Sequence, residues 1–161
     1  YRHYSVQNTT LLRETFPFLT HFPQAHTEHS TETQMPFIQH YFPHTKVIEI
    51  VYGKIDIKAL SSLIDTLLET PKTLVVISTD LSHFYTQEEA ATLDTLCINA
   101  IKELSLESFG KSEACGMRGI QAMVMSAKKH DFKAHLLDYR TNFERSRDAT
   151  RVVGYTSFLF A

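Results

Sequence analysis

From residue 46 onward the chain alternates short apolar runs with amphipathic stretches, and this alternation constrains the fold more than any other feature. Residues 46–53 (KVIEIVYG) and 72–79 (KTLVVIST) are rich in β-branched side chains and are predicted to be strands, the second of them apolar enough to be buried on both faces. Residues 132–141 and 151–160 predict two closing strands. Strands and helices in this order predict an α/β domain layered around a mostly buried mixed sheet.

Amphipathic stretches predict helices over residues 55–70, 86–104 and 115–130, because their apolar side chains recur at helical spacing. In the second helix the predicted inward stripe begins at Leu93 and includes Leu96 and Cys97. Glu88, Glu89 and Asp94 place negative charge in its N-terminal half, where the helix dipole favours it. A fourth helix, opening at Ser30, is expected to be short or kinked because Pro36 lies within it.

Composition bounds the class of protein. The 161 residues suit one domain, 1–161, with a real core, and 43% apolar with 21% charged residues is ordinary for a globular chain. A formal charge of −2 without basic blocks argues against a nucleic-acid partner. No apolar run is long enough to span a membrane. Two cysteines make no disulfide framework, which favours a cytoplasmic location.

The stretch STDLSH, residues 78–83, follows an apolar predicted strand and is the first candidate site. Asp80 and His83 are spaced i, i+3 and can face the same side. A carboxylate beside an imidazole orients one tautomer and prepares an acid–base group. The alternative is structural: Asp80 or Ser82 caps the helix that begins near Thr86, and His83 is a surface residue.

Two further segments carry ligand-type side chains. HTEHSTE, residues 26–32, could supply one metal-binding histidine and a carboxylate that orients it, although solvated loop histidines explain the pattern as well, and spacing does not rank His26 against His29. Cys115 begins a predicted helix, where backbone N–H groups stabilise a thiolate, the nucleophilic and metal-binding form. The alternative for Cys115 is a small buried hydrophobe, and that is our prediction for Cys97.

The order of these motifs resembles the Memo family, also called AmmeMemoRadiSam system protein B. The resemblance rests on EHSTE (28–32), STDLSHF (78–84), ACG (114–116) and VVGYTSFLF (152–160), and covers the chain from about residue 25. It implies one Memo-like α/β domain similar in fold to the class III extradiol (LigB-like) dioxygenases, which are non-haem iron enzymes.

Carried over by position, the resemblance implies a metal site formed by His29, Asp80, His83 and Cys115. His83, supported by Asp80, would match the acid–base histidine of the dioxygenases, and Cys115 would replace a ligand glutamate. The implied metal is iron(II) or copper. Family members also carry an earlier histidine in a Pro-His-Ala-Gly-Tyr-like motif, and this sequence contains no such string. With Tyr1 in place of Met, we expect the chain to be the C-terminal part of a longer protein.

Three functions follow as hypotheses. The first is a metal-dependent, dioxygenase-like oxidoreductase. The second is a non-catalytic module that binds a small molecule or peptide in the same pocket, as in signalling. The third, a hydrolase using Cys115 and His83, has suitable residue types but no oxyanion-hole motif. The family association adds AMMECR1-like and radical-SAM proteins as expected partners.

Overall fold

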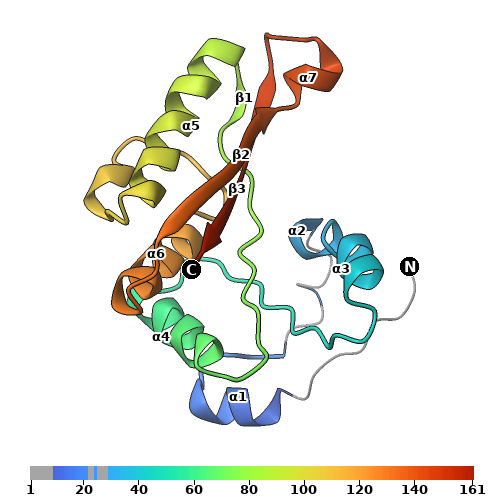
Figure 1. The fold of residues 1–161 in the computed structure, drawn as a ribbon, viewed down its shortest axis with the longest axis vertical. Coiled ribbons are helices and arrows are strands. Elements are labelled where there is room, and N and C mark those ends of the chain that lie inside the picture. The colour runs from blue at the N-terminus through green and yellow to red at the C-terminus, as the bar shows by residue number, and fades with distance from the viewer. Residues whose placement is uncertain (1–8, 22–23, 25–28) are drawn as a thin grey trace. The chain divides into compact units, whose positions relative to one another are not determined.

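The computed structural model describes residues 9–21, 24 and 29–161 (Figure 1). The chain divides into two compact units, Tyr1–Lys54 and Ile55–Ala161, and each is described by itself. The mixture of helices and strands confirms the predicted α/β class. No helix among the described residues is both long and apolar enough to cross a membrane.

The described part of the first unit is helical. It contains α1 (Thr10–Thr15), α2 (His29–Glu32) and α3 (Met35–Tyr41). The helix predicted to open at Ser30 is therefore divided in two, and Pro36 lies in the first turn of α3, where a missing N–H group leaves no helical hydrogen bond unmade. The expectation of a short or kinked helix is confirmed.

The second unit contains the three long helices that periodicity predicted. They are α4 (Ile57–Leu68), α5 (Gln87–Lys102) and α6 (Met117–Lys129), with two short elements, η2 (Glu107–Phe109) and α7 (Phe143–Ser146). A capping box begins α5: the Thr86 hydroxyl accepts the Glu89 N–H, and the Glu89 carboxylate accepts the Thr86 N–H. Helices α4 and α6 pack on each other, whereas α5 packs on the strands.

The described strands form one three-stranded antiparallel sheet in the order β1-β3-β2 (Figure 1). Strands β2 (Ala134–Thr141) and β3 (Val152–Phe160) make a long hairpin and confirm the two predicted closing strands. The third strand, β1 (His83–Tyr85), was not predicted; it pairs with Val152 and Val153 of β3. This pairing brings the end of STDLSH onto the sheet.

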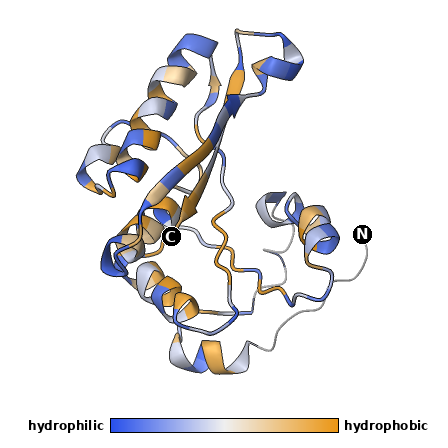
Figure 2. Ribbon diagram, in the orientation of Figure 1, coloured by the Kyte–Doolittle hydropathy of each residue, from blue (hydrophilic) through white to orange (hydrophobic). Residues whose placement is uncertain are grey.

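Two other predicted strands do not form. Apart from a single bridge residue at Val47, residues 46–53 and 72–79 belong to no strand in the described chain. Their composition is that of buried strands, but a strand also needs a hydrogen-bonded neighbour along its length, which composition does not supply. As a result Val51, Leu74 and Val76 are exposed, and the apolar connection between α4 and β1 stands out in Figure 2.

The core of the second unit lies between α5, α6 and the sheet. Its members are buried apolar side chains from α5, α6, η2 and the loop before β1: Leu81, Cys97, Ile98, Ala100, Ile101, Phe109, Ile120 and Val124. The prediction that Cys97 is a packing residue is confirmed. The predicted inward stripe of α5 is confirmed at Cys97, Ala100 and Ile101, but Leu96 is 42% exposed and the buried face also contains Asp94.

Candidate metal site

The site is built on the loop that leads from residue 78 into β1. Leu81 is 1% exposed and belongs to the core, so it anchors the middle of the loop. Its N–H donates to the Gly154 carbonyl at 2.9 Å, and the Gly154 N–H donates to the Ser82 carbonyl at 3.0 Å. Because this backbone is attached to β3, the flanking side chains of Asp80 and His83 project from a fixed support.

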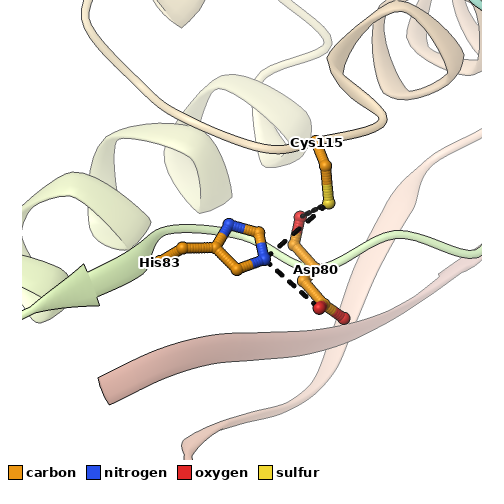
Figure 3. A group of neighbouring side chains, drawn as sticks. All are labelled: Asp80, His83 and Cys115. Atoms are coloured by element: carbon orange, nitrogen blue, oxygen red, sulfur yellow. Dashed lines mark hydrogen bonds and ion pairs between the residues drawn. The ribbon is translucent and has the colours of Figure 1, made fainter. Parts of the chain in front are cut away.

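Asp80, His83 and Cys115 come together at this support (Figure 3). One potential ligand atom from each lies within 4.8 Å of the others. His83 Nε2 is 3.3 Å from Asp80 Oδ2 and 3.9 Å from Cys115 Sγ. Thus two segments 32 residues apart place an acid, an imidazole and a thiol around one point.

Thr79 attaches the Cys115 segment to the loop. Its hydroxyl accepts the Gly116 N–H at 2.7 Å, donates to the Asp80 carbonyl at 3.0 Å, and lies 3.7 Å from Cys115 Sγ. One hydroxyl therefore links the backbone on both sides of the cluster.

A second hydrogen bond joins β1 to the Cys115 segment: the Tyr85 hydroxyl donates to Glu113 Oε1 at 2.8 Å, and this hydrogen bond raises the pKa of Tyr85.

The cluster is half-exposed, with Cys115 exposed and the Asp80 and His83 side chains 46% and 32% exposed. It borders an open pocket of about 360 Å³, whose lining is Leu81, His83, Ser112, Glu113, Ala114, Cys115 and Met117. The pKa of the neighbouring Tyr155 is raised, mainly by its burial and secondly by the negative charge of Asp80. The site is thus accessible from solvent and carries local negative charge.

Two of the three ligand-atom separations are close to those around a metal ion, and the third, between Asp80 and Cys115, lies within 4.8 Å. Around a tetrahedral ion with metal–nitrogen and metal–oxygen bonds near 2.0–2.1 Å and a metal–sulfur bond near 2.3 Å, adjacent ligand atoms lie about 3.3–3.6 Å apart. The observed imidazole–carboxylate separation of 3.3 Å falls within that range, and the sulfur–imidazole separation of 3.9 Å is only slightly wider. Carboxylate, imidazole and thiolate together form a donor set for a transition metal.

The structure also bears on two other hypotheses for these residues, the capping role of Asp80 or Ser82 and the Cys115–His83 hydrolase. Thr86 caps α5, so neither Asp80 nor Ser82 does, and that alternative is wrong. The hydrolase hypothesis finds the thiol and imidazole neighbours at 3.9 Å. However, the backbone N–H next to the thiol, that of Gly116, already donates to Thr79 and is not free to stabilise an oxyanion.

His29, the fourth predicted ligand, lies in the first unit. It begins α2, its side chain is 86% exposed, and its Nδ1 is 3.0 Å from Glu32 Oε2. A carboxylate on one imidazole nitrogen leaves the other nitrogen available as a ligand, the arrangement that orients metal-binding histidines. Its participation in the site stays a prediction. His26 lies outside the described residues.

Sequence reasoning missed one residue at this site. Asp94 was interpreted as an acid whose charge the helix dipole favours, yet its side chain is fully buried against the loop before β1. Its Oδ1 accepts the Ser82 N–H at 3.0 Å, and its Oδ2 accepts the Tyr139 hydroxyl at 2.8 Å. The signal was present: Asp94 follows Ala90 by four residues and precedes Cys97 by three, which puts a charge on the buried face of α5.

The fold and the site together describe an α/β protein with a candidate metal site, in which an acid, an imidazole and a thiol lie where a loop enters the sheet. The family model described as "Memo-like protein" matches residues 7–159. The chain therefore belongs to the Memo-like family, whose fold is that of the class III extradiol (LigB-like) dioxygenases.

Individual relatives agree. The chain is 30% identical over 144 residues to a "MEMO1 family protein" of Archaeoglobus fulgidus, covering 83% of this chain and 55% of the relative. It is 32% identical over 145 residues to the one of Methanobrevibacter smithii (83% and 51%) and 33% identical over 145 residues to that of Methanosarcina acetivorans (82% and 54%). The chain spans about half the length of these relatives.

Proposed function

We propose that this Memo-like chain contributes Asp80, His83 and Cys115 to a metal site in a dioxygenase-like oxidoreductase, and that His29 completes the ligand set. The observation that carries the proposal is the convergence of three ligand atoms within 4.8 Å, from two segments remote in sequence. A bound iron(II) or copper ion would supply Lewis acidity and one-electron redox chemistry. The thiolate favours the softer metals of this group.

The residues of the chain have separable tasks in this proposal. Cys115 must lose its proton to become a ligand, so metal binding should release protons and tighten as pH rises. His83 directs Nε2 into the cluster, and that nitrogen either binds the ion or carries a proton for the reaction. In the second case Asp80 holds the imidazole in one orientation and stabilises its charged form.

The test is an anaerobic titration of the full-length protein with ferrous and copper ions, followed by oxygen-uptake measurements. We expect one ion per chain and a loss of affinity of at least tenfold in His29→Ala and Cys115→Ala. The matched control is Cys97→Ala, because Cys97 is a buried core cysteine that is not one of the clustered ligand residues, so its replacement should leave the affinity unchanged. His83→Ala decides between the two roles of the imidazole: weak binding indicates a ligand, and full binding without oxygen uptake indicates an acid–base group. A folded protein that binds no metal contradicts the proposal.

The open pocket favours a second candidate, a module that binds a small molecule or peptide without turnover. Leu81, Ala114 and Met117 give its lining an apolar component beside the polar cluster. The same titration separates the candidates: metal loading without oxygen uptake, together with ligand binding at the pocket, supports the module. The proposed partners, AMMECR1-like and radical-SAM proteins, are tested by co-purification with the full-length protein.

A further inference from the structure

We infer that Asp94 is a positioning residue, which sets the geometry of the Asp80–His83 pair by fixing the peptide group between them. This inference rests on the proposed function, because the geometry being set is that of the candidate metal site. Asp94 lies in the middle of α5, is fully buried, and is neither a pocket-lining residue nor one of the three candidate ligands. It acts through Ser82.

The backbone of Ser82 is fixed on both sides. Its N–H donates to Asp94 Oδ1 at 3.0 Å, and its carbonyl accepts the Gly154 N–H at 3.0 Å. Asp80 precedes this residue by two positions and His83 follows it directly. A small rotation of the Ser82 peptide would therefore move both side chains, and would change the 3.3 Å separation on which the metal site depends.

The carboxylate that performs this task is itself held in place. The Tyr139 hydroxyl of β2 donates to Asp94 Oδ2 at 2.8 Å. Gly154 leaves the space that the carboxylate occupies, because a Cβ atom at this position would overlap the Asp94 side chain. A buried carboxylate is costly unless its oxygens are hydrogen-bonded, so two donors and a glycine gap are what keep it there. Helix α5, strands β2 and β3 and the loop before β1 thus meet at one side chain.

Two pairs of variants test the inference in the full-length protein. Asp94→Ala removes the acceptor of the Ser82 N–H, whereas Asp94→Asn keeps an oxygen in its place. Gly154→Ala keeps the carboxylate but displaces it, which makes the inference testable even if Asp94→Ala does not fold. Asp65→Ala is the matched control, since Asp65 is a mostly buried aspartate of α4 whose partners, Lys129 and His130, lie in or at the end of α6.

Two readouts are needed. Hydrogen exchange of the Ser82 amide in the metal-free protein should be slow in the wild type and in Asp94→Asn, and at least tenfold faster in Asp94→Ala and Gly154→Ala. Cobalt(II) affinity, followed by the thiolate-to-cobalt absorption band, should fall about 10- to 100-fold in the same two variants and within about threefold of wild type in Asp94→Asn and Asp65→Ala.

The two readouts test metal binding and the role of Asp94 separately. If the wild type binds no cobalt, the proposed function fails, and the exchange of the Ser82 amide still tests whether Asp94 fixes the loop. Folded Asp94→Ala or Gly154→Ala protein with wild-type amide exchange and wild-type cobalt affinity overturns the inference. Equal loss of cobalt affinity in Asp65→Ala also overturns it, because the effect would then follow from general destabilisation.

Discussion

Two regions of the second unit are built from the same kinds of residue and differ in what they support. In the helix pair α4–α6, Leu63 is buried and Asp65 is paired with the cation Lys129. In the loop before β1 and its backing by α5, Leu81 is buried and Asp94 is paired with the neutral donors of Ser82 and Tyr139. The first region joins two helices, and the second holds a candidate metal site. The comparison shows that burial alone does not identify a residue that serves the site; its hydrogen-bond partners do.

The largest effect expected comes from the two leucines. Leu63 and Leu81 are each 1% exposed, so replacing either by alanine should lower the free energy of unfolding by about 3 kcal/mol. Only Leu81→Ala should also weaken metal binding, because Leu81 lies between Asp80 and Ser82. Denaturant unfolding and cobalt titration of both variants measure this. Equal weakening of metal binding by Leu63→Ala would remove the distinction between the regions.

The next effect concerns Tyr139. Replacing it by phenylalanine leaves Asp94 Oδ2 without its donor in a buried position, and should cost about 1–3 kcal/mol of unfolding free energy. Burial, and then the hydrogen bond to Asp94, raise the pKa of Tyr139, so this hydroxyl should ionise only above the ordinary tyrosine pKa of 10 in an alkaline titration of the folded protein. Absorbance at alkaline pH and chemical denaturation check both statements. A Tyr139 that titrates at its ordinary pKa would show that the hydrogen bond is not formed.

A smaller effect concerns the pH dependence of the Asp65–Lys129 pair. Burial alone would raise the pKa of Asp65, but hydrogen bonds from Lys129 and Ser126 and the nearby positive charges outweigh it and lower the pKa below its ordinary value of 3.8. Because the folded-state pKa is the lower one, the stabilisation is complete above the ordinary value and is lost as pH falls through 3.8 and below. Lys129 is 61% exposed, so solvent screening limits the contribution to under about 1 kcal/mol.

Asp65→Asn should therefore lower stability slightly at pH 7 and lose less of it between pH 5 and 2 than the wild type does. Denaturation midpoints measured across this range provide the check. A variant that follows the wild-type acid profile throughout would show that the Asp65–Lys129 pair contributes nothing to stability.

An effect of similar size separates two buried serines. The Ser126 and Ser61 hydroxyls are 2.9 Å apart, so Ser126→Ala should cost about 1 kcal/mol. Ser82 Oγ is equally buried but has no hydrogen-bond partner among the described residues, so Ser82→Ala should leave stability unchanged or raise it. Thermal unfolding of the two variants compares them directly, and a larger loss for Ser82→Ala would mean that its hydroxyl has a partner in the full-length protein.

Much of the fold could be predicted from local sequence. The helices α4, α5 and α6 and the hairpin β2–β3 were found because periodicity and caps are local signals. Residues 46–53 and 72–79 were not correctly predicted, since composition shows that a segment suits a strand but not that a neighbour will pair with it. Strand β1 was missed for the converse reason: its three residues follow a polar stretch, and only pairing with β3 makes them a strand.

Part of the candidate site could likewise be predicted from the sequence, and part could not. Asp80, His83 and Cys115 were candidates from their residue types, the resemblance to the Memo family grouped them in one metal site, and the structure brings these three together. Asp94 could not be assigned from its type, because an acid in the first half of a helix has an ordinary explanation. Its role depends on the loop before β1 and the Tyr139 hydroxyl meeting α5 at this side chain, and local sequence does not show these tertiary contacts.

The central claim is that the Cys115 thiolate is a ligand of one metal ion bound at the Asp80–His83–Cys115 cluster. X-ray absorption spectroscopy of the metal-loaded full-length protein tests it most directly. The account predicts one sulfur neighbour at about 2.3 Å, accompanied by nitrogen or oxygen neighbours at about 2.0–2.2 Å, with the sulfur contribution absent in Cys115→Ser. A bound ion surrounded by nitrogen and oxygen alone in the wild type would contradict it.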